Sequence, residues 1–79
     1  MEKADYVLPP AQTEFESQEA KVLFINQSMD VCMKATQAAD SYWNQMLYGR
    51  AQANYILSLD GYMALLKITK DDPNYQAYL

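Results

Sequence analysis

The fold is decided by residues 13–59, which read TEFESQEAKVLFINQSMDVCMKATQAADSYWNQMLYGRAQANYILSL. After Thr13 this stretch contains no proline and one glycine, Gly49, so little in it interrupts a helix. Thr13 and Glu16 have the spacing of a capping box, in which each side chain accepts a hydrogen bond from the other residue's backbone N–H. The sequence therefore predicts a helix that begins at Glu14.

Two long helices are the preferred interpretation of this stretch. The first is expected to run from Glu14 into residues 36–40 and the second over residues 41–59, with a bend near residues 38–41 between them. An unbroken rod over residues 14–59, about 69 Å long, is the alternative at a rise of about 1.5 Å per residue.

A short third helix is expected after the second. Gly61 can adopt the left-handed conformation that closes a helix, so the second helix is predicted to stop there. Residues 62–69 then form the third helix. In the tail, residues 71–79, Asp72 and Pro73 are typical of the N-cap and first residue of a last turn.

Residues 1–12 are expected to form an extended N-terminal arm. Pro9 and Pro10 disfavour helix in this segment. Its apolar residues, which a purely disordered tail would not need, are Tyr6, Val7 and Leu8. The arm is therefore expected to dock, either on the protein's own helices or on a neighbouring subunit.

The expected fold class is all-α: a helical hairpin or small bundle with two long helices, a short third helix and an extended N-terminal arm. The expected parts are the arm (1–12), a helical domain (13–70) and a C-terminal tail (71–79). Spacings of three, four or seven residues give the expected core stripe of Phe15, Val22, Ile25, Met29, Cys32, Ala39, Trp43 and Met46. A second apolar set lies beside or opposite it: Leu23, Phe24, Val31, Met33 and Ala35. A helix with two apolar faces needs neighbours on two sides.

The composition lacks the usual carriers of chemistry. The chain has no histidine and one cysteine, Cys32, so an internal disulfide, a structural zinc site and a Cys-His dyad are excluded. The expectation is a protein that is not an enzyme, with no catalytic, cofactor-binding or metal-binding residues.

The charge and the apolar runs limit the partners. The net charge is −4 and the six basic residues are scattered, so direct nucleic-acid binding is not expected. No apolar run reaches the roughly 20 residues of a membrane span. Acidic residues and prolines stand where a signal peptide needs an apolar run, which predicts a cytoplasmic protein or one incorporated into a larger particle or filament.

Tyrosines recur at a helical spacing of seven residues: Tyr48, Tyr55 and Tyr62. Tyrosine suits interfaces because its ring covers area while its hydroxyl still finds a hydrogen-bond partner. The predicted partner-binding residues are this row, the apolar residues of the arm and the tyrosines of the tail: Tyr6, Val7, Leu8, Tyr48, Tyr55, Tyr62, Tyr75 and Tyr78.

The leading functional hypothesis is a non-enzymatic helical interaction or structural protein, a subunit or adaptor of a larger homo- or hetero-assembly. A single core in so short a chain supplies only about 3 to 5 kcal/mol, and association is the remaining way to stabilise it. A homo-oligomer or a protein partner is therefore expected. The alternative is a small acidic inhibitor of the kind that phages encode, which binds and blocks a target protein.

Two short stretches resemble known families. Leu47-Tyr48-Gly49-Arg50-Ala51-Gln52-Ala53-Asn54 resembles the Leu-Tyr-Arg-Asn-Ala-Gln-Ser-Asn stretch of type III secretion needle subunits, which are helical hairpins that stack into a filament. This resemblance implies a needle-like filament subunit, although the proline-containing loop between the needle helices is absent. Asp72-Pro73-Asn74-Tyr75 resembles the close of a tetratricopeptide repeat, but the small residues of the preceding repeat helix do not line up.

Overall fold

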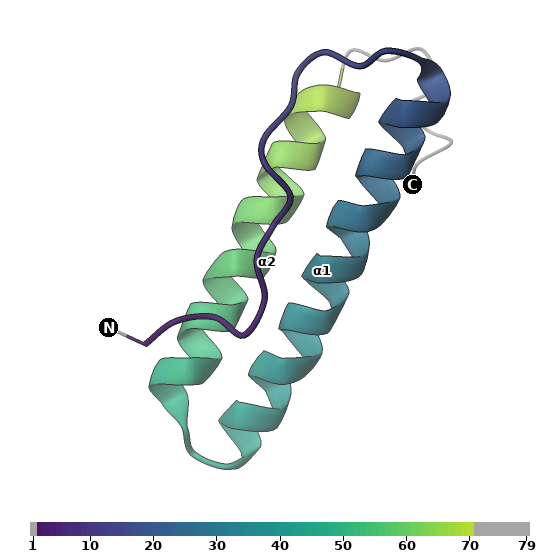
Figure 1. Ribbon diagram of the computed structural model, residues 1–79. Coiled ribbons are helices and arrows are strands. Elements are labelled where there is room, and N and C mark those ends of the chain that lie inside the picture. Colours follow the sequence, from purple (N-terminus) through teal and green to yellow (C-terminus); the bar gives the residue numbers. More distant parts are fainter. Residues whose placement is uncertain (1, 71–79) are drawn as a thin grey trace.

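The computed structural model describes residues 2–70, which form two antiparallel helices joined by a short turn (Figure 1). Helix α1 spans Gln18–Asn44 and helix α2 spans Tyr48–Thr69, and residues 2–70 contain no strand. The longest dimension is 42 Å, about the length of α1 alone at ~1.5 Å per residue. The predicted all-α hairpin is confirmed, and the unbroken rod is wrong.

Helix α1 begins later than the predicted capping box. Ser17 is the N-cap, and its hydroxyl accepts a hydrogen bond of 3.1 Å from the backbone N–H of Ala20. The reason is a contact between Phe15 and Phe24, whose ring centroids lie 5.4 Å apart. In one continuous helix these residues would lie on opposite faces, because nine positions amount to about two and a half turns. Tertiary packing therefore displaces the start from Glu14.

The predicted bend near residues 38–41 is wrong, because α1 continues to Asn44. The chain reverses at Met46, which has a φ of 65°. The N–H of Leu47 donates to the carbonyl of Tyr42 at 2.8 Å, and the N–H of Met46 donates to the carbonyl of Trp43 at 3.0 Å. This pair of bonds is a Schellman motif, which usually has glycine where this chain has Met46.

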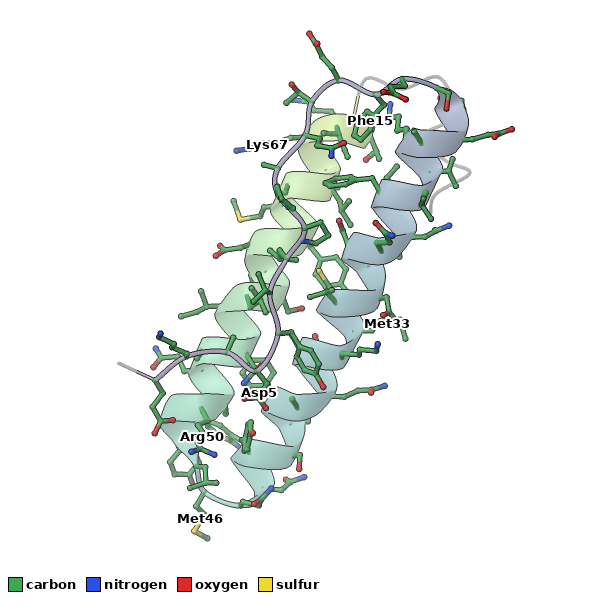
Figure 2. The ribbon with its side chains drawn as sticks, viewed as in Figure 1. Asp5, Phe15, Met33, Met46, Arg50 and Lys67 are labelled. Atoms are coloured by element: carbon green, nitrogen blue, oxygen red, sulfur yellow. The ribbon has the colours of Figure 1, made fainter. Side chains whose placement is uncertain are left out.

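Substitution of Met46 by glycine is expected to stabilise the fold by about 1 kcal/mol, because a left-handed backbone strains a side chain that carries Cβ. The side chain projects beyond the turn into solvent, so little packing is lost (Figure 2). Chemical denaturation of both chains measures the difference. Lower stability of Met46→Gly would contradict this account of the turn.

The predicted stop at Gly61 and the separate third helix over residues 62–69 are wrong. Both belong to α2, and Gly61 does not have a positive φ. A Cβ placed on Gly61 would overlap Cys32 Sγ and would lie 3.0 Å from Leu8 Cδ2. This glycine therefore permits close packing inside a helix.

The two helices meet along a seam of mostly small side chains. The buried residues of α1 recur at spacings of three and four: Ile25, Ser28, Cys32, Ala35 and Ala39. Those of α2 do the same: Ala51, Asn54, Ser58, Gly61 and Leu65, followed by Thr69. Of the expected core stripe, Ile25, Cys32 and Ala39 are buried, whereas Trp43 and Met46 are exposed. Large apolar side chains at the turn end of the hairpin are therefore not core.

The segment before α1 lies along the protein's own hairpin (Figure 1). The backbone N–H of Asp5 donates to Asn54 Oδ1 at 3.1 Å, and the Tyr42 hydroxyl donates to Asp5 Oδ2 at 2.5 Å. Further along, Leu8 contacts the backbone of α2 beside Gly61. The segment thus runs in the direction of α2 and covers one side of the groove between the helices.

Candidate protein-interaction surface

The small residues of the seam leave the larger apolar side chains of α2 on the outside. Four of these recur at spacings of three, four and three residues: Ile56, Leu59, Met63 and Leu66. Their exposed fractions are 48%, 61%, 59% and 51% in that order. At about 100° per residue this outer stripe is centred roughly 140° around α2 from the buried seam. It is an apolar row that the described part of the chain leaves about half exposed, although the N-terminal segment borders Ile56 and Met63 at two hollows.

The tyrosine row, Tyr48, Tyr55 and Tyr62, lies between the outer stripe and the seam, roughly 80° from the seam on the same helical geometry. The hydroxyl of Tyr55 donates a hydrogen bond to Asp40 of α1. This hydrogen bond raises the pKa of the Tyr55 phenol above its usual value, because the neutral phenol is the donor. Tyr55 is thus held in place, and its neighbours in the row remain exposed.

Tyr48 and Trp43 form a second aromatic contact at the turn end of the hairpin. Their ring centroids lie 4.7 Å apart in an edge-to-face arrangement. Both side chains are about half exposed. The pair extends the apolar surface of α2 toward the turn.

The predicted partner-binding residues of the arm lie on the other side of the hairpin and have different surroundings. Leu8 is half-buried against α2, Tyr6 is partly exposed, and Val7 is 86% exposed. The structure therefore brings Tyr48, Tyr55 and Tyr62 together on one helix but does not join them to the arm. Tyr75 and Tyr78, and the last turn predicted at Asp72, lie outside the described residues.

A second cluster of polar contacts fixes the start of the N-terminal segment. The guanidinium of Arg50 lies 5.7 Å from the centre of the Tyr42 ring, and Arg50 Nε is 3.7 Å from Glu2 Oε2. The hydrogen bond to Asp5 raises the pKa of the Tyr42 phenol. Asn54, which is fully buried, accepts from Asp5 and donates to the carbonyl of Arg50 at 2.9 Å. These groups satisfy one another's hydrogen bonds and charges, so the cluster holds the start of the N-terminal segment against the hairpin.

The described residues show no grouping of metal ligands: between residues 2 and 70, no three His, Cys, Asp or Glu side chains converge. Cys32 is buried in the seam, and burial raises the pKa of its thiol, which opposes nucleophilic chemistry. A hollow of about 280 Å³ between the N-terminal segment and α2 is lined mainly by apolar groups, and Ile56 of the outer stripe is one of its lining residues. What the described side chains of α2 and the N-terminal segment offer is apolar surface for contact with another molecule.

The outer stripe was missed by sequence reasoning. Its signal was the alternation of three and four between Ile56 and Leu66, but the expected helix end at Gly61 divided it into two unrelated pieces. Once α2 is continuous, the spacing is that of two successive a and d pairs of a coiled-coil seam.

Within residues 2–70, neither helix is long and apolar enough to cross a membrane. The chain matches no protein-family model, no curated protein and no solved structure.

Proposed function

We propose that this chain is a non-enzymatic helical interaction protein, a subunit or adaptor of a larger assembly, which binds a protein partner through the outer face of α2. The observation that carries the proposal is the outer stripe of Ile56, Leu59, Met63 and Leu66. With Tyr48 and Tyr62 it leaves on the order of 600 Å² of side-chain surface uncovered, at the upper end for the largest apolar patch of a monomer.

Energetics support an interaction role for this surface. Water contact with large apolar side chains is unfavourable by about 25 cal/mol per Å², so a partner that covers the stripe gains stability from the hydrophobic effect. The buried seam of the hairpin, in contrast, consists largely of Ala, Ser, Cys and Gly. The chain thus keeps several of its largest apolar groups outside its own core.

The test is isolation of the tagged full chain from the cells in which it naturally occurs, compared with two variants of equal charge. Leu59→Glu places a carboxylate in the outer stripe, and Leu23→Glu places one at a similarly exposed position of α1, 58% against 61%. A bound protein should be retained by the unaltered chain and by Leu23→Glu. Leu59→Glu should lose it by at least about tenfold, because a buried charge without a partner is costly.

The same proteins bound to all three chains would overturn the proposal, because the outer stripe would then not be the binding surface. Helical circular dichroism of the purified variants verifies that both remain folded.

A further inference from the structure

We infer that the outer stripe of α2 pairs with the outer stripe of a second copy of this chain, so that two hairpins associate through their α2 helices. This inference rests on the proposed function and names the partner. Ile56, Leu59, Met63 and Leu66 have the spacing of a coiled-coil seam, in which each side chain enters a hole on a facing helix. The facing surface must therefore be another helix with a matching apolar row.

The stripe is complementary to itself. Two-fold symmetry brings the same patch of both copies together, and here the patch contains four side chains of similar size. Whether the two α2 helices run parallel or antiparallel, these four side chains meet the same four of the second copy. No differently shaped surface is needed to fill the contact.

Charge also permits two copies to approach at α2. The chain carries a net charge of −4, but α2 contains only Arg50, Asp60 and Lys67 as charged residues. Most acids of the described part lie on the N-terminal segment and on α1. Beside the outer stripe stand Tyr55 and Tyr62 on one side, and Asp60 and Lys67, of opposite sign, on the other. Neither flank carries a row of like charge, so repulsion is weak where contact is made.

The exposed area is close to that which a stable dimer needs. A specific interface buries about 800 Å² on each partner, and the outer stripe with Tyr48 and Tyr62 supplies on the order of 600 Å² before any rim is counted. The N-terminal segment is anchored at Asp5 and Leu8 and leaves most of the stripe free. It borders Ile56 at one hollow and Met63 at another, yet these side chains remain 48% and 59% exposed.

Sedimentation equilibrium of the purified full chain, from about 1 µM to about 500 µM, tests this inference. The unaltered chain should reach twice the monomer mass within that range. Leu59→Glu should weaken the dimer by at least about 100-fold, because the two-fold axis places two carboxylates in one seam. Leu23→Glu, with the same charge change on α1, should dimerise like the unaltered chain.

A monomer throughout the range, or a dimer indifferent to Leu59→Glu, overturns the inference. Equal loss of the dimer in Leu23→Glu also overturns it, because the effect would then come from net charge. A different result refutes the proposed function: the same bound proteins on the unaltered chain and on both variants. If the unaltered chain is monomeric but its cellular partner is still lost on Leu59→Glu, the stripe binds a different protein and only the second copy is refuted.

Discussion

Replacement of Gly61 by alanine is expected to destabilise the folded chain by about 3 kcal/mol or more, at the upper end for overpacking. In an ordinary helix interior the same change stabilises by about 1 kcal/mol, so the sign itself is diagnostic. Here the new methyl group would overlap Cys32 Sγ of α1 and press on Leu8 of the N-terminal segment. Both helices and the segment must separate to admit it. Urea denaturation followed by circular dichroism measures the difference.

Gly49 provides the matched control, because it lies in the same helix and the atoms nearest to a Cβ there belong to the side chain of Glu2, with Oε2 at 3.3 Å. That carboxylate is exposed and can move, so Gly49→Ala should be neutral or stabilising by about 0.5 kcal/mol. In the Cys32→Ala background, where the sulfur is gone, Gly61→Ala should cost much less than in the unaltered chain. An unchanged cost would show that Cys32 is not the obstacle.

Helix content was predictable from residues 13–59, but the ends of the helices were not. Thr13 and Ser17 both offer a capping hydroxyl, and the contact of Phe15 with Phe24, which one continuous helix would not allow, favours a start at Ser17. At the turn, Met46 has a left-handed conformation that glycine usually adopts. Because no glycine stands there, the sequence did not indicate where the turn lies. Gly61 gave the opposite error, because a glycine that stops a helix and one that admits a neighbour look alike in sequence.

The candidate interaction surface on α2 was also predictable only in part, because burial depends on how the two helices pack together. The seven-residue spacing of Tyr48, Tyr55 and Tyr62 indicated one helical face, and the structure places all three on α2. Which face is buried depends on side-chain size across the seam. Large residues suggest a core, yet here Ala35 and Ala51 are buried while Trp43 is exposed. Close packing of small residues is a property of the pair of helices, and periodicity in one helix does not reveal it.

The second large effect is expected in the N-terminal segment, where Leu8→Ala should destabilise the chain by about 2 kcal/mol or more. Leu8 packs where α2 has no side chain, at Gly61, so its removal leaves a gap beside the α2 backbone. The adjacent substitution, Val7→Ala, should change stability by less than about 0.5 kcal/mol, because Val7 is 86% exposed. Thermal unfolding of the two variants in parallel gives the comparison.

Deletion of residues 1–12 extends this test and separates docking on the chain's own hairpin from docking on a neighbour. The segment supplies Leu8 and both hydrogen bonds of Asp5, to Asn54 and from Tyr42, so the shortened chain should lose cooperative unfolding and much of its helical signal. At concentrations where the chain is monomeric, this loss should not depend on protein concentration, since the contacts lie within one chain. A shortened chain that keeps its helical signal and loses only association would place the segment on a neighbouring subunit. Val7 and Leu8 would then be part of the surface that contacts that neighbour.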